Sequence, residues 1–391
     1  MQLVIPAGVP WDDGRWACAL LREAGHEAWF VGGCVRDLIL LREVHDVDIA
    51  TSAHPEDVIA CFPNVIEVGR SFGVILAVHP SGRHIEIATF RHDGSYIDGR
   101  RPTTIVFSTA CDDVKRRDFT INGLLLDPLS GTVVDYVDGV TDIEHRCLRV
   151  IESPQRLAED RLRVLRGLRF MAHLELTATS DTWAALCATE LTGLSRERIW
   201  QEIQKGLSFR PAAWFQAVVT SGHLTEVWPI NAEAVESISA HLRRVQPDDD
   251  VIVALTIISF PHAGPAWWSW LQSEPVPRDL LRRLRSLCLA VSQLIAGCPL
   301  AMRRRICRSA EAQAVGRVLT CMQQVPEILH WLAIEADIGP LVPLVTAQDL
   351  LAAGIPTGPR IGLLLHEITD KQLRGELSDS DAARRWIESQ K

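Results

Sequence analysis

The chain has 391 residues, of which 47% are hydrophobic and 23% are charged, and its net charge is −9. A chain of this length can bury a large core in more than one domain, and its acidic balance excludes a generally basic coat for nucleic acid, though not a local basic groove. The ten cysteines lack Cys-x-x-Cys spacing, the N-terminus lacks a signal-peptide pattern and the apolar runs are too short to span a membrane, so we expect a cytoplasmic protein without a zinc knuckle, a disulfide frame or a membrane contact.

Helical and strand-like patterns alternate through the first part of the chain. Apolar residues at helical spacing predict a helix over residues 12–26, with Gly25 as its stop, and further helices over 36–41 and 55–61. Strands are expected at residues 28–31, 47–50, 65–68, 74–78, 85–90, 104–107 and 132–136. Together these elements predict a mixed α/β domain of about 140 residues, with a pair of aspartates on a central strand.

Few strand signals remain after Arg149, and helix caps become frequent. Helices are expected at residues 153–174, 180–189, 195–208 and 212–221. The remainder continues as helices joined at Pro and Gly breaks, and residues 261–277, with three tryptophans and four prolines, are expected to form a loop or a helix junction. The predicted fold class is therefore α+β, with an N-terminal mixed-sheet domain followed by an all-α remainder.

Asp46 and Asp48 form the pattern with the clearest chemistry. Residues at i and i+2 of a strand project from the same side, and two adjacent carboxylates suit Mg²⁺, which usually takes one or two carboxylates plus substrate phosphates. Gly32 and Gly33 allow backbone N–H groups to approach a phosphate, and Arg36 adds a positive charge. Each part alone could be a solvated loop, a turn or a surface ion pair, but the ordered set favours transfer of a nucleotidyl group.

A basic triplet at residues 115–117 is the second feature. Such a run is by default a solvated face. Here it is followed by Asp118, Thr120 and Asn122, which supply hydrogen-bonding groups able to contact a ribose or hold a loop, next to charges able to hold a triphosphate.

Residues 156–170 are the third feature. If this segment is one helix, Glu159, Asp160 and Arg163 share a face, and Arg166 lies farther along it. Most patterns of this kind are exposed, salt-bridged helices. The alternative is that Asp160 and Arg163 present an acceptor and a forked donor to a nucleobase, because cytosine and adenine both offer an amino donor beside a ring-nitrogen acceptor. Spacing alone leaves both interpretations open.

With these segments the chain resembles the class II tRNA nucleotidyltransferase/poly(A) polymerase family of the polymerase-β-like superfamily. The resemblance is carried by residues 32–37 (GGCVRD), 46–51 (DVDIAT), 116–122 (RRDFTIN), 159–163 (EDRLR) and 194–199 (LSRERI). These motifs occur in the family's order and spacing, and their combination is specific.

The resemblance implies a tRNA 3′ end as primer, CTP and ATP as substrates, and Mg²⁺ as cofactor. It implies a nucleotidyltransferase head over residues 1–149, a helical neck with a nucleotide-selecting helix over 150–225, and an RNA-binding body and tail over 226–391. Asp46 and Asp48 would be the catalytic metal ligands. The implied nucleotide-binding residues are Gly32, Gly33 and Arg36 for the triphosphate, Arg117, Asp118 and Asn122 for the ribose, and Glu159, Asp160 and Arg163 for the base, with Arg166 beside them.

Several segments allow both a functional and a purely structural interpretation. Residues 91–101 resemble the family's flexible loop that assists the switch from C to A addition, or form a plain surface loop. Residues 346–362 resemble a tail element whose Gly-Pro turn could hold an RNA phosphate, or a simple helical pack. Arginines within 303–308 could follow an RNA backbone or be solvated. Glu86 is a third carboxylate near the metals or a solvent-facing strand residue. Residues 41–42 (LR) depart from the family, which has a glycine-containing turn there.

Four hypotheses follow from the sequence. The first is a template-independent enzyme that adds CCA to tRNA from CTP and ATP and releases pyrophosphate. The second keeps the same active site but adds only the terminal A, or makes a poly(A) tail. The third is a non-catalytic RNA-binding protein, which the intact Asp46, Asp48 and Arg36 disfavour. The fourth, a metal-independent small-molecule binder, leaves the arginine-rich segments unexplained.

Overall fold

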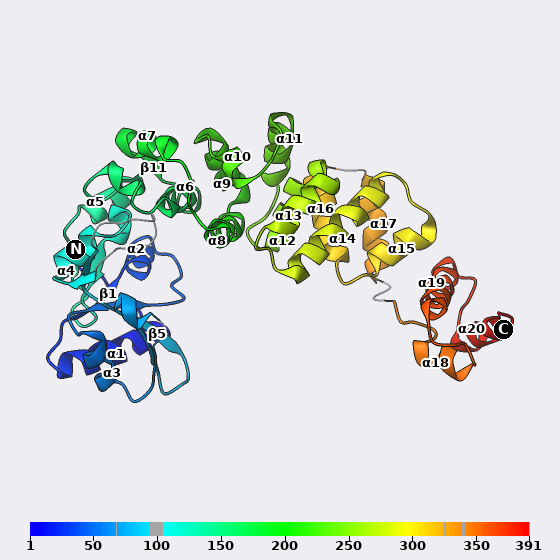
Figure 1. Cartoon of the computed structure of the whole chain (residues 1–391), viewed down its shortest axis with the longest axis horizontal. Helices are drawn as coiled ribbons and strands as arrows, with labels where there is room; N and C mark the ends of the chain where they lie inside the picture. Colours follow the sequence, from blue (N-terminus) through cyan, green and yellow to red (C-terminus); the bar gives the residue numbers. More distant parts are fainter. Residues whose placement is uncertain (68, 94–104, 324–325, 338–340, 391) are drawn as a thin grey trace. The chain divides into compact units, whose positions relative to one another are not determined.

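The computed structural model describes residues 1–67, 69–93, 105–323, 326–337 and 341–390. The chain forms two compact units, one of residues 1–206 and 213–228, the other of residues 207–212 and 229–391 (Figure 1). Within the described ranges, no helix is long and apolar enough to cross a membrane.

A seven-stranded mixed sheet forms the centre of the first unit. Its strands are β1 (Ala28–Val31), β2 (Asp48–Thr51), β3 (Val65–Ile66), β4 (Val74–Val78), β5 (His84–Thr89), β8 (Leu124–Leu126) and β9 (Val133–Asp135). Their order is β3-β4-β5-β2-β1-β8-β9, and β2 pairs with β5 in parallel while the other neighbours are antiparallel. Two short pairs stand apart, antiparallel β6 (Arg91–Asp93) with β7 (Ile105–Phe107) and parallel β10 (Cys147–Leu148) with β11 (Thr177–Ala178).

The predicted strands are present with small shifts at their ends. Those predicted at 28–31 and 74–78 have the observed bounds, and the predicted central strand runs from Asp48 to Thr51 in the middle of the sheet. Strand β8 was not predicted, because a run of three leucines is too short and too apolar to show alternation.

Short helices cover this sheet. They are α1 (Trp11–Glu23), α2 (Gly33–Ile39), α3 (Pro55–Cys61), α4 (Ala110–Lys115) and α5 (Gly139–Glu144), with 3₁₀ turns η1 (Arg70–Phe72) and η2 (Thr120–Asn122). Acidic residues in the first turn of α1 and Arg22 in its last turn interact favourably with the helix dipole and stabilise the helix. The helix buries Ala17, Cys18 and Leu21. It packs beside α3 against the strands (Figure 1).

Apart from the short β10–β11 pair, the rest of the first unit is helical. It contains the 3₁₀ turn η3 (Pro154–Leu157), then α6 (Leu162–Leu174), α7 (Ser180–Ala188), α8 (Arg196–Leu207), α9 (Pro211–Thr220) and α10 (Leu224–Val227). The single helix predicted over 153–174 was wrong, because a turn at residues 158–161 separates η3 from α6. Asp160 accepts a hydrogen bond from the N–H of Leu162 at 3.2 Å, the local side-chain bond by which Asp competes with a continuous helix.

The second unit is built from helices alone in its described part. Its elements are α11 (Ala232–Leu242), α12 (Val251–Ser259), η4 (Phe260–His262), α13 (Pro265–Ser273), α14 (Arg278–Ile295), α15 (Leu300–Cys307), α16 (Ala312–Cys321), α17 (Pro326–Asp337), α18 (Ala347–Ala352), α19 (Pro359–Arg374) and α20 (Ser380–Glu388). The segment predicted as a loop or junction over 261–277 instead contains α13. Its Pro265 lies in the first turn of the helix. Proline is tolerated there because the backbone N–H that it lacks would have no partner within the helix. The predicted α+β fold class is confirmed.

One departure from the family pattern has a visible consequence. Leu41 adopts a φ of 55° and its side chain is 93% exposed. A branched side chain rarely takes this left-handed conformation, so the backbone keeps the shape for which glycine is suited although the sequence lacks glycine there.

Candidate active site

The register of the sheet brings the glycine turn and the aspartates to one edge. Val31, the last residue of β1, pairs with Asp48, the first residue of β2, and the chain turns into α2 at Gly32. Gly32 has a φ of 78°, which favours glycine, and a Cβ built on it would lie 3.2 Å from Nη1 of Arg117. Gly32 is buried and its N–H donates to the carbonyl of Leu124 at 3.2 Å, whereas Gly33 is partly exposed. The turn therefore lies directly beside an arginine and is reached by solvent through Gly33.

Three carboxylates gather around this edge. Asp48 begins β2, but Asp46 lies in the irregular segment before the strand, so the prediction of both aspartates on a central strand is correct for Asp48 alone. The parallel register that pairs Ile49 with Ile87 puts Glu86 next to Asp48 on the same face. This placement favours the third-carboxylate interpretation of Glu86, although its role stays a prediction.

The carboxylates repel one another. Asp48 is accessible to solvent, but the surrounding protein displaces part of its hydration. This desolvation, with the charges of Glu86 and Asp46, raises the pKa of Asp48 to about 7 against the opposing effect of Arg117. A divalent cation would relieve that repulsion.

The donor set suits a hard cation that keeps part of its coordination for substrate. Within the described ranges, no three His, Cys, Asp or Glu side chains form a ready-made metal site. Phosphate oxygens and water would therefore complete the coordination around Asp46 and Asp48, as is usual for Mg²⁺. Cys34, close to Asp48, has its pKa raised to about 12 by burial, so it is unsuited to act as a thiolate nucleophile.

Arg36 is held rigidly by its neighbours. Its Nη1 donates to Oδ1 of Asn122 at 2.6 Å, and its Nε and Nη2 donate to the carboxylate of Asp37 at 3.0 and 2.8 Å. Its guanidinium carbon lies 5.1 Å from the ring centre of Phe170, which the guanidinium of Arg166 also approaches, to 5.4 Å. A fixed arginine loses little entropy when it binds an anion.

Asp118 is the buried centre of a second network. Its Oδ1 accepts from Nδ2 of Asn122 at 2.9 Å and from the N–H of Phe119, and its Oδ2 accepts from Nε of Arg166 at 2.8 Å. Burial disfavours its charge, but the charge of Arg166 and these donors outweigh burial and lower the pKa of Asp118 to about 2. Asn122 therefore links Asp118 to Arg36.

Asp113 is a site residue that the sequence reasoning missed. It is 1% exposed in α4, where its Oδ1 pairs with Nη2 of Arg116 at 2.7 Å and its Oδ2 with Nη2 of Arg117 at 2.9 Å. Desolvation raises its pKa, but the two arginines reverse that effect and lower it. The i, i+3 and i, i+4 spacing of an acid and two arginines was the signal that could have identified it.

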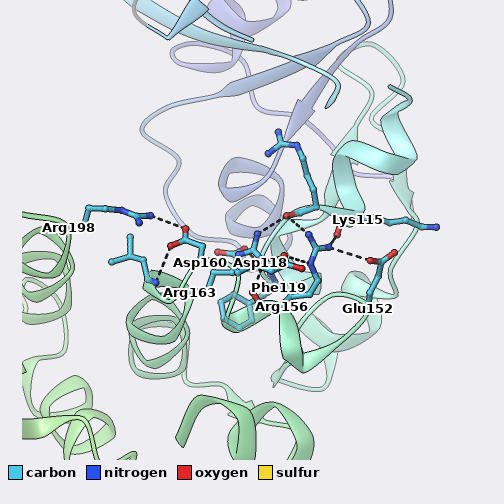
Figure 2. A network of polar contacts seen from close by, with 11 residues as sticks. Lys115, Asp118, Phe119, Glu152, Arg156, Asp160, Arg163 and Arg198 are labelled. Atoms are coloured by element: carbon cyan, nitrogen blue, oxygen red, sulfur yellow. Dashed lines mark hydrogen bonds and ion pairs between the residues drawn. The ribbon is translucent and has the colours of Figure 1, made fainter. Parts of the chain in front are cut away.

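The proposed base-reading residues do not share a helix face as predicted. Glu159 and Asp160 lie in the turn before α6, and Arg163 lies in its first turn. Figure 2 shows Asp160 facing Arg198, to which it pairs at 2.9 Å. Nη1 of Arg163 donates to the carbonyl of Arg156 at 3.1 Å and to Glu159 at 3.4 Å, and its Nη2 donates to a second carbonyl.

One cleft of about 670 Å³ in the first unit collects most of the predicted residues. Glu86 and Glu159 are not among its lining residues, and Phe170 and Lys205 line it without having been predicted. The predicted residues that line it are Gly32, Gly33, Arg36, Asp46, Asp48, Arg117, Asp118, Asn122, Asp160, Arg163 and Arg166.

The segments with two explanations have different outcomes. Arg91 begins the short strand β6, and most of the predicted 91–101 loop lies outside the described residues. The chain turns into α19 at Gly358 as predicted, and α18 to α20 share a small core of their own. The arginines of 303–308 each contact other groups of the second unit, and two of them pair with buried Glu335. This cluster therefore has a structural role.

A mixed sheet that presents carboxylates, a glycine turn and fixed arginines to one cleft defines the class of protein: it is a nucleotidyltransferase. Known proteins agree with this class. The model of the poly A polymerase head domain matches residues 28–149.

Full-length relatives specify the family. The CCA-adding enzyme of Lactobacillus johnsonii is 33% identical over 384 residues, covering 93% of each chain, and that of Levilactobacillus brevis is 31% identical over 375 residues, covering 93% of this chain and 94% of the relative. The structure of the Bacillus stearothermophilus CCA-adding enzyme in complex with CTP matches with a TM-score of 0.80 at 25% identity over 98% of both chains. The Thermotoga maritima CCA-adding enzyme complexed with tRNA has a similar fold, with a TM-score of 0.68 at 19% identity over 97% of this chain and 95% of that one.

The chain therefore belongs to the class II CCA-adding enzyme/poly(A) polymerase family of nucleotidyltransferases. The family resemblance expected from the sequence motifs is confirmed, as is the enzyme class. Members of this family generally use a divalent metal ion.

Proposed function

We propose that this protein adds CCA to the 3′ end of tRNA from CTP and ATP and releases pyrophosphate. The observation that carries the proposal is one cleft that holds the carboxylates of Asp46 and Asp48 together with Asp160 and Arg163. A metal-binding edge and a base-reading pair in one place allow transfer without a nucleic-acid template. The full-length similarity to CCA-adding enzymes supports the same activity.

The triphosphate binds at the glycine turn in this proposal. The N–H of Gly32 is bonded to the carbonyl of Leu124 at 3.2 Å, so the phosphate is held from the Gly33 side of the turn, with charge from Arg36 and Arg117. Asp113 and Asp37 position these guanidiniums before substrate arrives. Such pre-organised charge stabilises the negative charge that develops on the phosphoryl oxygens in the transition state.

Asp46 and Asp48 would hold Mg²⁺. Held there, the ion would lower the pKa of the primer 3′-hydroxyl and would neutralise charge on the leaving pyrophosphate. The chain's own task is to hold the attacking hydroxyl and the α-phosphate in line, so the reaction needs no side-chain nucleophile.

Asp160 and Arg163 select the base. The Asp160 carboxylate accepts from the amino group that cytosine and adenine share, and Arg163 donates to the ring nitrogen next to it. Uracil and guanine present a carbonyl where cytosine and adenine have the amino group, and an N–H in place of the ring-nitrogen acceptor. The carbonyl would face the Asp160 carboxylate and the N–H would face the Arg163 guanidinium, so neither pair can form a hydrogen bond. The hydrogen bonds that Arg163 now makes to backbone carbonyls hold it ready, and the base replaces one of them. Glu159 positions Arg163, and Asp118 with Asn122 contacts the ribose.

The helical second unit holds the RNA primer while the first unit transfers nucleotides. The expected head, neck, body and tail boundaries at residues 149 and 225 belong to this proposal. The expectation of a cytoplasmic protein also belongs to this proposal.

Staged primers test the proposal. The protein is incubated with Mg²⁺, labelled nucleotides, and tRNA transcripts that end before the tail, after C and after CC. Incorporation of CTP and then ATP is the expected result. ATP incorporation restricted to the CC-ending transcript would replace the proposal with A addition, and long A tracts would indicate a poly(A) polymerase. No incorporation, with Asp48→Ala binding RNA like the unmodified protein, would identify a non-catalytic RNA binder.

A further inference from the structure

The second unit contains a hollow of about 1110 Å³, larger than the catalytic cleft. One wall comes from η4 and α13, the other from the exposed face of α14. This is the tryptophan- and proline-rich segment of the sequence, and nucleotide transfer in the first unit leaves it without a role.

The first wall is aromatic. Trp267, Trp268 and Trp270 all line the hollow, and the rings of Trp267 and Trp270 lie 5.0 Å apart. The His262 ring lies 5.3 Å from Trp267 at an interplanar angle of 31°. Trp267 is only 5% exposed and supports the wall from behind, while Trp268 and Trp270 are partly exposed. These two rings provide a stacking surface for a planar ligand.

The opposite wall carries the charge. Arg285 lies 5.5 Å over the ring of Trp268, and it is the only formally charged residue among those that line the hollow in the described part of the chain. Leu289 and Ser292 follow it on the same face of α14. An uncompensated arginine in a chain of net charge −9 makes the hollow a local positive site.

Two polar atoms in the wall lack partners. Nε1 of Trp267 and Nε2 of His262 are buried without a hydrogen bond to any described residue. Both atoms are closed off from solvent, so a ligand in the hollow would bind through the exposed ring faces and Arg285 rather than through these two groups.

We propose that this hollow binds an unpaired nucleotide of the RNA primer, with the base stacked on the tryptophans and the phosphate beside Arg285. The identity of the ligand as primer RNA rests on the proposed function. An apolar peptide would leave Arg285 without a counter-charge, and paired bases would not reach the rings. A stacked nucleotide uses the aromatic wall and the charge at once.

The test measures fluorescence anisotropy with two fluorescein-labelled probes, an oligouridylate of about 12 nucleotides and a blunt RNA duplex of the same length. Trp268→Ala should raise the Kd for oligouridylate about tenfold, while Trp268→Phe, which keeps a stacking ring, should restore most of the affinity. Arg285→Ala should raise it about threefold, with a weaker salt dependence. Affinity for the duplex should change little in Trp268→Ala, because the duplex offers no unpaired base.

Arg282→Ala is the matched control. Arg282 is three residues from Arg285 on α14, its side chain is 77% exposed and pairs with Asp279, and it does not line the hollow. Its loss should leave both affinities nearly unchanged. Circular dichroism checks folding, and if Trp268→Ala does not fold, Arg285→Ala decides the question through the Kd for oligouridylate and its salt dependence.

An unchanged Kd for oligouridylate in folded Trp268→Ala and Arg285→Ala would overturn the inference. Equal losses with oligouridylate and duplex would overturn it too, by showing a plain phosphate contact. So would self-association of the unmodified protein in sedimentation that Leu289→Glu abolishes, because a second copy would then be the occupant. Failure of the nucleotide-incorporation assay would reject the proposed function and leave this binding result intact.

Discussion

Arginines paired with carboxylates occur in both units, but they serve different ends. In the first unit, Arg36 and Arg166 are fixed by Asp37 and Asp118 while they line an open cleft. In the second unit, Glu335 is 3% exposed, and Arg304 and Arg308 pair with it at 2.9 and 2.8 Å. Pairing therefore does not identify a functional arginine. A functional arginine is distinguished by the open cleft beside its ion pair and by the adjacent glycine turn.

The largest expected effect comes from removing a carboxylate of the cleft. Asp48→Asn should lower kcat at least about a thousandfold, because it removes a proposed metal ligand and the charge stabilisation that would depend on it. The melting temperature should not fall, since the side chain is accessible to solvent. Single-turnover incorporation measures the effect, and a kcat within tenfold of the unmodified protein would place the chemistry elsewhere.

Removing a buried carboxylate of the second unit should lower stability and leave catalysis unchanged. Glu335→Ala should destabilise this unit by roughly 3–5 kcal/mol, because it leaves two arginines without their buried partner. The KM for CTP should not change. Urea unfolding measures the loss, and Asp381→Ala, which removes a 79% exposed partner 3.8 Å from Arg384, should cost less than about 1 kcal/mol. Equal losses in the two variants would contradict the assigned role of Glu335.

The base-reading pair gives a smaller and more selective effect. Arg163→Lys keeps the charge but loses the forked donor, so discrimination of CTP and ATP against UTP should fall about tenfold to a hundredfold. Arg169→Lys is the control, because Arg169 pairs with buried Glu202 and does not line the cleft. Competition between labelled CTP and UTP measures the ratio. Retained selectivity in Arg163→Lys would remove Arg163 from base recognition.

Acid should weaken both units through the same physics. The pKa of Asp118 is lowered to about 2, so its stabilisation is present above pH ~4 and is lost as the pH falls through about 2. This contribution is about 2 kcal/mol, and Asp118→Asn should remove it from the acid limb of the stability curve. Asp249, whose pKa Arg317 also lowers, provides the comparison in the second unit. Asp249→Asn should change the acid limb without changing nucleotide transfer, whereas Asp118→Asn should impair both.

The smallest expected effect is a pH dependence of stability opposite to that of Asp118, and it comes from Asp48. Because the pKa of Asp48 is raised to about 7, the folded metal-free protein keeps a proton that the unfolded chain has lost above pH ~4. Stability should therefore fall as the pH rises from about 4 to 7, and Asp48→Asn should remove that fall, a gain of about 1 kcal/mol at pH 8 after solvent screening. Thermal melts with chelator measure it. Added Mg²⁺ should cancel the difference, and a stability curve that rises over this pH range would contradict the assigned repulsion.

The sequence was most informative where local signals coincide. The central strand, the glycine turn and the aspartates were all predictable, because alternation, a Gly-Gly pair and acidic residues define them locally. Asp113 could have been found from its spacing to Arg116 and Arg117. The pairing of Val31 with Asp48 could not, because register depends on contacts that no single segment encodes.

The arginine-rich segment shows the limit of periodicity. Residues 153–174 have helical spacing throughout, yet the helix breaks before Leu162 because Asp160 bonds the backbone locally and pairs with Arg198. No local pattern predicts that the ring of Phe170 lies within 5.4 Å of the guanidiniums of Arg36 and Arg166. These contacts join residues far apart in the sequence, so local sequence patterns could not predict them.

The central claim is that a single cleft performs every transfer. Rates of C addition to a transcript ending before the tail and of A addition to one ending in CC, measured for the unmodified protein and Asp48→Asn, test it most directly. Loss of both additions by the same large factor is the predicted result. Survival of either addition in Asp48→Asn would contradict the account, because that transfer would then use another site.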